Sequence, residues 1–466
     1  MTRFDAATAA TSASAGFRTA AEIGHTELGP RPLPALAEQR AATGLSSVDT
    51  VLDSGLRVVA VHAPTVPMVE LRLRIPFAGA DPLHAARAEV LAATILTGTK
   101  RRDRVAIDTD LALVGGELDA GVDPERLSIS GNALASGFDT LLDVLADALT
   151  GATYADDEVG RERGRLVERI AVARSQPSVI AREALQKHRY GDHPYTREMP
   201  EASDVATVTG DQVRALHADG VLPRGSVLVL VGDIEPADAV ARLGKALSVW
   251  SDERAAAVLP DLPDVTGGDV LFVPRAGAVQ SQLRLTAQAI ARTDPRYPAL
   301  QLANLVFGGY FSSRLVENIR EDKGYTYHAR SSLEFTPSGA TLLVESDTAS
   351  EVTAPALLET RYELARLGVV PPTESEVDSV RQYAIGSLLI ATASQTGLAS
   401  QLAALASLGL GVDWLVAHPA RLAAVTAEQI AEAALEFFSP TRYTGVVVGD
   451  AAQLPLLRSL GGVVSA

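Results

Sequence analysis

The segment "SVLVLVGDIEP" (226–236) has a counterpart near the end of the chain, "YTGVVVGDAAQ" (443–453). In both segments a short apolar run ends in Gly-Asp, which is typical of a buried β-strand followed by a turn. The two glycines, Gly232 and Gly449, lie 217 residues apart. A repeat at this distance indicates that the chain contains two related halves.

The same spacing recurs just upstream of each strand. "VTGDQV" (208–213) and "VTAEQI" (425–430) are again 217 residues apart. In both, a Thr precedes a helical pattern, and Thr is favoured at helix N-termini because its hydroxyl accepts a hydrogen bond from an unpaired backbone N–H. We therefore predict a Thr-capped helix before each of the two strands.

A third match lies near the start of each half, at a slightly different spacing. "VELRLRIPF" (69–77) and "SQLRLTAQA" (281–289) alternate apolar and polar residues, as half-buried strands do. Each is followed by a turn containing proline and by an Ala/Leu-rich helix, expected at 82–97 and 298–307. Any α/β protein contains several such strand–helix pieces, but three matches favour a duplication.

The predicted fold class is therefore α+β. We expect two duplicated halves of about 200 residues each, every half a mixed or antiparallel sheet covered by helices, arranged as a clam-like pair. The N-terminal half covers 35–250 and the C-terminal half covers 269–466, and a linker with two prolines joins them at 251–268. The Ala/Thr/Ser-rich residues 1–34 are predicted to form a flexible tail.

Composition narrows the functional classes. The chain has 466 residues, a formal net charge of −16 and no cysteine. The negative charge argues against nucleic acid or an anionic membrane as a partner and is compatible with a positively charged peptide. The lack of cysteine excludes disulfides, thiol catalysis and Cys-ligated metal sites, and it is compatible with a reducing compartment.

The N-terminus lacks the apolar core of a secretory signal, and no run of about 18 strongly apolar residues predicts a membrane span, so we expect a cytoplasmic protein.

Arginine and tyrosine are concentrated in "GGYFSSRLVENIREDKGYTY" (308–327). This segment resembles the Gly-Gly-Gly-x-Ser-Ser-Arg-Leu to Ile-Arg-Glu-x-x-Gly-x-x-Tyr stretch of the pitrilysin/insulinase-like zinc peptidases, and in particular their mitochondrial-processing-peptidase branch. "YGDHPYTREMPE" (190–201) is similar to the His-Pro-Tyr-Gly segment of the same family. The resemblance extends over roughly residues 45–460, and the two related halves agree with it.

The resemblance implies where a zinc site would lie. In that family a helix of the N-terminal half carries His-x-x-Glu-His, whose two His bind zinc and whose Glu acts as general base, and a later helix adds a Glu ligand. No His-x-x-Glu-His occurs in this sequence. Aligned on the Gly-Thr pair (98–99) that follows the motif, Glu89 and Ala93 stand at the His positions. Ala92 stands at the catalytic Glu, and Arg169 stands at the third ligand.

These substitutions remove the groups that would bind zinc and transfer protons. Alanine has no side-chain atom that binds a metal or moves a proton, and arginine repels a cation. We therefore predict no metal, no cofactor and no catalytic residue in this chain. Because the ligand positions face each other in the family fold, we expect Glu89 and Arg169 to form a buried ion pair in place of zinc, which would add little net stability over apolar side chains. The eight His residues are expected to be structural or superficial.

The C-terminal half keeps the family's other site residues. In the family, an Arg and a Tyr seven residues later grip the bound peptide opposite the zinc, and Arg320 and Tyr327 have this spacing. The resemblance implies that the Arg320 guanidinium binds a peptide carbonyl or carboxylate and that the Tyr327 hydroxyl binds the scissile carbonyl. Tyr325 would share the face of Tyr327 on a regular strand and is the alternative. Without the resemblance, Arg320 would be assigned to an ion pair with Glu321 or another acidic neighbour on a solvated helix.

The glycine pair Gly308-Gly309 allows two interpretations. It can be the turn that ends a helix. It can instead be a mobile loop where substrate backbone approaches, although the family's glycine-rich loop in the non-catalytic subunit is longer.

Lost zinc positions together with a kept Arg/Tyr pair match one member of a heterodimeric peptidase. We expect a homologous zinc-bearing subunit with His-x-x-Glu-His as the partner, with zinc in that subunit only. Arg320 and Tyr327 would complete the partner's site inside a closed chamber. The expected substrates are unfolded peptides, bound by strand addition to a sheet edge.

Three alternatives remain. The chain could be a structural subunit of the same fold, against which the kept Arg/Tyr pair argues. It could bind peptides alone or as a homodimer, without hydrolysis. An enzyme with other chemistry is disfavoured because no Gly-x-Ser-x-Gly elbow, phosphate loop or dinucleotide fingerprint occurs.

Overall fold

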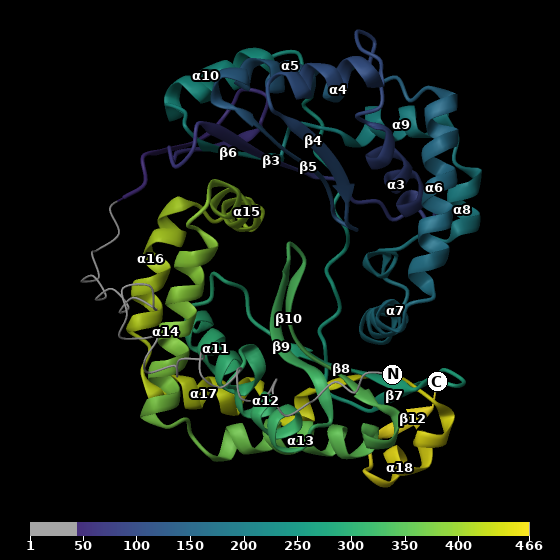
Figure 1. Cartoon of the computed structure of the whole chain (residues 1–466), viewed down its shortest axis with the longest axis vertical. Coiled ribbons are helices and arrows are strands. Elements are labelled where there is room, and N and C mark those ends of the chain that lie inside the picture. The colour runs from purple at the N-terminus through teal and green to yellow at the C-terminus, as the bar shows by residue number, and fades with distance from the viewer. Residues whose placement is uncertain (1–43, 466) are drawn as a thin grey trace, which may run out of the picture. The chain divides into compact units, whose positions relative to one another are not determined.

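The structure is a computed structural model that describes residues 44–465, and the residues from Leu45 onward form one compact unit (Figure 1). The predicted flexible tail (1–34) lies outside the described residues. The helices and strands of the first half are β1 (Ser47–Val51), β2 (Arg57–His62), β3 (Met68–Pro76), α3 (His84–Thr94), α4 (Arg104–Leu113), β4 (Glu117–Val122), β5 (Arg126–Leu134), α5 (Phe138–Gly151), α6 (Asp156–Arg174), α7 (Pro177–Tyr190), α8 (Ala202–Thr207), α9 (Gly210–Gly220), β6 (Val227–Gly232) and α10 (Pro236–Ala246).

The second half repeats the same kinds of element. They are β7 (Val270–Pro274), β8 (Gln280–Gln288), α11 (Tyr297–Asn304), α12 (Arg314–Val316), β9 (Thr326–Thr336), β10 (Gly339–Ala349), α13 (Thr353–Val369), α14 (Glu374–Ala391), α15 (Gln395–Ala406), α16 (Val412–Ala423), α17 (Ala427–Phe437), β11 (Thr444–Gly449), α18 (Leu454–Ser459) and β12 (Val463–Ser465). Residues 251–269 between the halves form no helix or strand, and Leu259 and Val265 anchor this segment by burial.

Each half of the described chain contributes one mixed sheet of six strands. The strand orders are β1-β2-β6-β3-β5-β4 and β12-β7-β11-β8-β10-β9. β3 in the first sheet and β8 in the second each run antiparallel to both of their neighbours. In contrast, β2 and β6 pair in parallel in the first sheet, and β7 and β11 do so in the second. The shared order confirms the α+β class and the duplication. It also makes β4 and β9 the corresponding edge strands.

The predicted strands and capped helices are present. β3 and β8 occupy the two alternating segments, and every residue of β6 and β11 is buried. α9 and α17 each begin with a capping box, in which Thr209 and Thr426 exchange hydrogen bonds with the Gln three residues later. The helices after β3 and β8 are shorter than predicted. The second of them, α11, ends at Asn304 because residues 305–309 continue as a π-helical turn.

Two helices are exchanged between the halves. α15 of the second half packs on β3 and β6 of the first sheet, where Leu398 and Leu402 share a buried cluster with Val59 and Val229. α7 of the first half packs on β8 and β11 of the second sheet, where Leu185 is buried. Figure 1 shows α15 beside the first sheet and α7 beside the second. Burying a Leu side chain contributes about 1.5–3 kcal/mol, so each sheet depends on a helix from the other half.

Hydrogen bonds reinforce this helix exchange. At the start of α15, Gln395 Nε2 donates to the backbone oxygens of Ala63 (2.6 Å) and Val66 (2.9 Å) in the first half. The neighbouring Thr396 hydroxyl donates to Glu70 Oε1 on β3 (2.7 Å). Because Gln395 and Glu70 are buried, these bonds satisfy polar groups that would be costly to leave unpaired.

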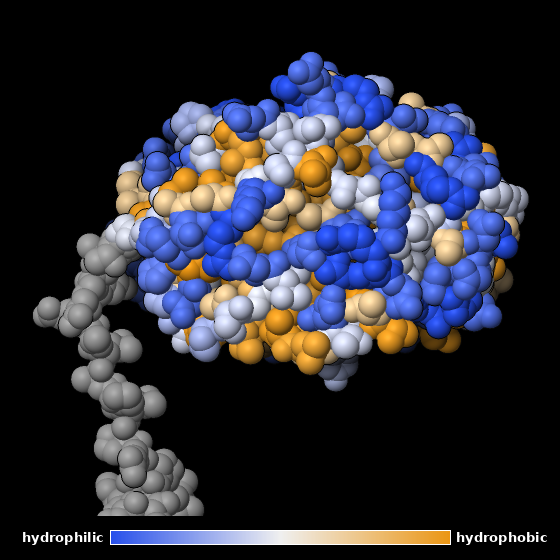
Figure 2. Space-filling view, turned by 90° about the horizontal axis from the view of Figure 1, so that it is seen from above, coloured by the Kyte–Doolittle hydropathy of each residue, from blue (hydrophilic) through white to orange (hydrophobic). Residues whose placement is uncertain are grey.

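The surface is polar over most of the face seen in Figure 2, with smaller hydrophobic patches between the hydrophilic side chains. Among residues 44–465, no single helix is long and apolar enough to cross a membrane. α14 and α15 pass that test only when taken together, and the axis bends by 109° between them.

Candidate functional site

The first half places the four degenerate zinc positions on two neighbouring helices. Glu89, Ala92 and Ala93 lie on α3, and Arg169 lies on α6. Ala92 is buried, and Ala93 is partly buried against the same hydrophobic core. Arg169 Nη2 lies 3.4 Å from Glu89 Oε2, which confirms the predicted ion pair.

The prediction that this pair is buried is wrong. The side chain of Arg169 is 70% exposed and that of Glu89 is 25% exposed, because the arginine head group stays in contact with water. Burial raises the pKa of Glu89, the charge of Arg169 opposes the rise, and the nearby Glu198 adds to it. With one partner this exposed, the pair contributes at most about 1 kcal/mol.

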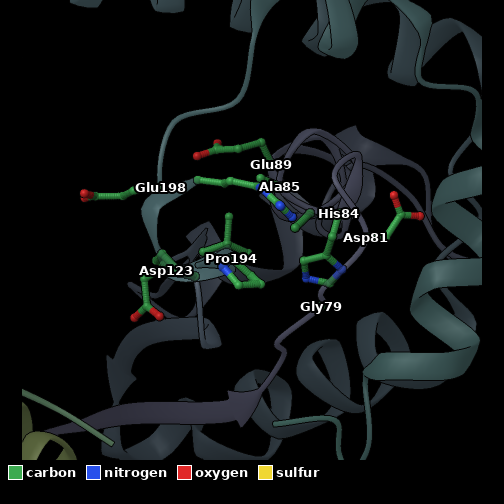
Figure 3. A pocket seen from close by; sticks show the side chains of 12 residues that line it. Gly79, Asp81, His84, Ala85, Glu89, Asp123, Pro194 and Glu198 are labelled. Carbon is green, nitrogen blue, oxygen red and sulfur yellow. The ribbon is translucent and has the colours of Figure 1, made fainter. Parts of the chain in front are cut away.

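A small pocket of about 20 Å³ lies beside these residues (Figure 3). His84, Glu89, Asp123 and Glu198 are among its lining residues. The carboxyl groups of Asp81 and Glu198 point to opposite sides in Figure 3 instead of converging. The His84 ring is engaged elsewhere, since its Nε2 lies 2.9 Å from the backbone oxygen of Phe77 and burial lowers its pKa.

The residues at this place do not fit zinc. Two of the four positions offer no donor atom, and a guanidinium sits against the one remaining carboxylate. Within residues 44–465, no group of three or more His, Asp or Glu side chains is arranged to hold a metal. No step of a zinc-dependent reaction can therefore be assigned to this half.

In the second half, the glycine pair allows close packing. Gly308 and Gly309 end the π-helical turn that follows α11. A Cβ on Gly308 would lie 3.0 Å from the Ser331 Cβ, and a Cβ on Gly309 would lie 2.9 Å from Asn304 Nδ2. The same Asn304 and Ser331 exchange two hydrogen bonds, of 3.2 and 2.6 Å, which clamp α11 to β9. The pair thus serves packing between α11 and β9, which neither predicted interpretation included.

Arg320 lies in a second π-helical turn, at residues 317–322. Its side chain is 33% exposed, and its Nε lies 3.3 Å from Glu321 Oε1. The guanidinium carbon lies 4.7 Å from the ring centre of Phe311, which is itself 60% exposed. The contact with Glu321 engages one guanidinium nitrogen, so the other two nitrogens can donate to a ligand. π-helical turns of this kind are frequent at functional sites.

Tyr327 lies near the start of the edge strand β9 and is 94% exposed. Tyr325 packs against the hydrophobic core instead. The pairing of β9 with β10 shifts at residues 347–348, so that Thr326 and His328 face consecutive residues of β10 and Tyr327 faces none. This is a β-bulge. The prediction that Tyr325 and Tyr327 share a face is therefore wrong, and Tyr327 is the more exposed of the two.

Three side chains with different binding chemistry lie at the start of β9. Phe311, Arg320 and Tyr327 place an aromatic face, a cation and a phenol hydroxyl at the start of β9, whose outer edge is unpaired within residues 44–465. An unpaired edge offers backbone groups for strand addition, and both polar side chains can donate to peptide carbonyls. The sequence alone did not indicate Phe311, because its place beside Arg320 depends on how the chain turns between α11 and α12.

Two family models match the chain. The model described as "Insulinase (Peptidase family M16)" matches residues 88–202, and the model described as "Peptidase M16 inactive domain" matches residues 207–383. Together they cover more than half of the sequence. The first match begins within α3, next to the degenerate zinc positions.

Individual relatives agree with these matches. An uncharacterised zinc protease of Mycobacterium leprae is 27% identical over 310 residues, which are 65% of this chain and 70% of the relative. An uncharacterised zinc protease of Mycobacterium tuberculosis is 25% identical over 414 residues, covering 88% of this chain and 94% of the relative.

Solved structures share the fold. The peptidase M16 inactive domain from Pseudomonas fluorescens has a TM-score of 0.79 at 23% identity and covers 87% of this chain and 99% of its own. A protease from Helicobacter pylori has the same TM-score at 17% identity and covers 87% of this chain and 100% of its own.

Proposed function

Because this chain belongs to the insulinase-like peptidase family M16, we propose that it is the zinc-free subunit of a two-chain metallopeptidase. In this proposal a homologous partner with an intact His-x-x-Glu-His motif holds the zinc and hydrolyses peptides. This chain supplies Arg320 and Tyr327 to bind the substrate.

The contrast between the two halves carries the proposal. In the first half an ion pair between Glu89 and Arg169 stands where a metal would be held. In the second half Arg320 and Tyr327 reach solvent at an open sheet edge. A tyrosine that is 94% exposed gains little from burial within its own chain, so a binding role accounts for its position better than a structural role does.

The two side chains would act at different points of the substrate. The Arg320 guanidinium would hold a backbone carbonyl or a carboxylate through paired N–H donors. The Tyr327 hydroxyl would donate to the scissile carbonyl oxygen as negative charge develops there. The edge of β9 would pair with the extended peptide and set its register.

The first test is the metal content and activity of the purified components. We expect this chain alone to contain almost no zinc after dialysis against a weak chelator, and to cleave no quenched fluorescent peptide. Adding a homologous His-x-x-Glu-His chain from the same organism should produce cleavage. Tyr327→Phe should then lower kcat by about 10²-fold or more, and Arg320→Ala should lower kcat/KM.

Two exposed residues outside the site provide matched controls. Arg296 pairs with Asp294 and Glu436, and Tyr362 lies exposed on α13. Arg296→Ala and Tyr362→Phe should leave cleavage unchanged. Stoichiometric zinc in this chain alone would overturn the proposal. A complex that binds peptides but never cleaves them would favour a peptide-binding protein of the same fold.

A further inference from the structure

The exposure of Tyr327 depends on one inserted residue in β9. From His328 onward the side chains alternate, with His328 and Arg330 exposed and Ala329 and Ser331 on the core side. Continued without interruption, this alternation would put Tyr327 on the core side, because a shift by one residue moves a side chain to the opposite face. The bulge inserts one residue and so interrupts the alternation of side chains at this point. As a result, Tyr327 and His328 are both exposed.

One side chain holds the bulge in place. The Thr326 hydroxyl oxygen lies 2.5 Å from the backbone oxygen of Asp347 on β10 and 2.9 Å from that of His328, and it accepts the His328 N–H at 3.0 Å. Thr326 is buried. Its hydroxyl therefore links Thr326 and His328, the residues on either side of Tyr327, to β10. This link lies at the point where the backbone pairing of β9 and β10 is interrupted.

The other end of the segment is fixed independently. Gly324 N–H donates to the backbone oxygen of Arg320 (3.1 Å), and Tyr325 N–H donates to that of Ile319 (2.8 Å). Gly324 itself has a φ of 64°, in the left-handed region. Arg320 is thus held from the turn, whereas at the bulge that carries Tyr327 the Thr326 hydroxyl contacts both β9 and β10.

We infer that Thr326 is a positioning residue, whose hydroxyl stabilises the β-bulge that turns Tyr327 out of the core side and toward the substrate. The inference rests on the proposed function for its consequence in peptide binding. Its structural part concerns this chain alone and is tested separately.

The structural part is tested by chemical labelling of tyrosines. Tetranitromethane nitrates accessible tyrosines, and mass spectrometry of peptides reports the rate at each position. Thr326→Val keeps the shape of the side chain and removes the hydroxyl, so we expect nitration of Tyr327 to slow several-fold. Thr326→Ser keeps the hydroxyl and should restore the rate, while Tyr362 on α13 should react at the same rate in all three proteins.

The functional part is tested in the two-chain complex. Thr326→Val should lower kcat toward the value of Tyr327→Phe, and adding it to Tyr327→Phe should cause little further loss, because both changes remove the same interaction. Thr326→Ser should retain most of the activity. If Thr326 had only a structural role, the Val and Ser variants would instead have lower melting temperatures. The effect of Thr326→Val on kcat would then be the same with and without Tyr327→Phe.

The outcomes separate the two proposals. Unchanged nitration of Tyr327 in a folded Thr326→Val protein would overturn the positioning role, whatever the complex does. Slowed nitration, combined with cleavage that is insensitive to both Arg320→Ala and Tyr327→Phe, would support the positioning role and reject the proposed function.

Discussion

Glu89 is a carboxylate whose companion motif positions on α3, Ala92 and Ala93, offer no metal-binding atoms, and Arg169 faces it from α6. Its pKa is raised, chiefly by burial. A group whose pKa is higher in the folded protein than in the unfolded chain binds more protons when folded, so stability falls as the pH rises through the interval between the two pKa values. The raised pKa means that the charged form of Glu89 favours folding less than its protonated form does, despite the ion pair with Arg169.

The uncharged variant Glu89→Gln is accordingly expected to be neutral or more stable than the parent at pH 7, by less than about 1 kcal/mol. This difference should shrink as the pH is lowered below the ordinary pKa of a Glu side chain. Urea unfolding at both pH values measures it. A clear loss of stability at pH 7 would show that the pair with Arg169 outweighs burial.

The family spacing placed Glu89, Ala92, Ala93 and Arg169 on two helices, and the structure shows these helices side by side. The substrate-binding roles inferred for Arg320 and Tyr327 from their separation stay predictions. The sequence did not predict the exposure of Arg169, because exposure depends on what covers α6. It also placed Tyr325 and Tyr327 on one face, because the types of the residues in a strand do not indicate a β-bulge.

At the scale of single elements, the segment from α11 to β9 deviates from regular structure three times. Residues 305–309 and 317–322 form π-helical turns, and β9 begins with a bulge. The capping boxes of α9 and α17 and the buried strands β6 and β11 follow directly from sequence patterns. These deviations do not, because they depend on contacts between distant residues such as Asn304 and Ser331.

Gly324 joins the second π-helical turn to β9. Substituting Gly324 tests how firmly this segment is held. An added Cβ would meet no atom within 4 Å, so Gly324→Ala probes only the left-handed backbone. We expect a loss of about 1–2 kcal/mol in the free energy of unfolding. Gly386→Ala in α14 is the matched control, since its Cβ also meets no atom within 4 Å. It should stabilise by up to about 1 kcal/mol, and a similar response of both variants would contradict the strained geometry at Gly324.

At the scale of the whole described unit, the exchanged helices α7 and α15 couple the two sheets. The Ala- and Leu-rich sequence of α15 does not indicate which sheet covers it, so the sequence predicted two halves without predicting the exchange. The cluster formed by α15 and the first sheet contains side chains from both halves. Each half therefore completes the other's hydrophobic core.

Removing one contact of α15 should destabilise both halves together. Leu402 is fully buried against the first sheet, so Leu402→Ala should cost about 2–5 kcal/mol. Calorimetry should still show one cooperative transition, shifted to lower temperature. Ile390→Ala on α14, where the side chain is exposed, should change stability by less than about 0.5 kcal/mol. Two separated transitions in the Leu402 variant would show that the halves unfold independently.

The helix exchange has a consequence during synthesis on the ribosome. The last strand of the first sheet ends at Gly232, but the helix that covers that sheet begins only at Gln395. At translation rates of about 5–20 residues per second, the nascent first half waits on the order of ten seconds with a bare apolar sheet face. Newly made chains should therefore depend on chaperones that shield such a face, even though the finished protein buries it.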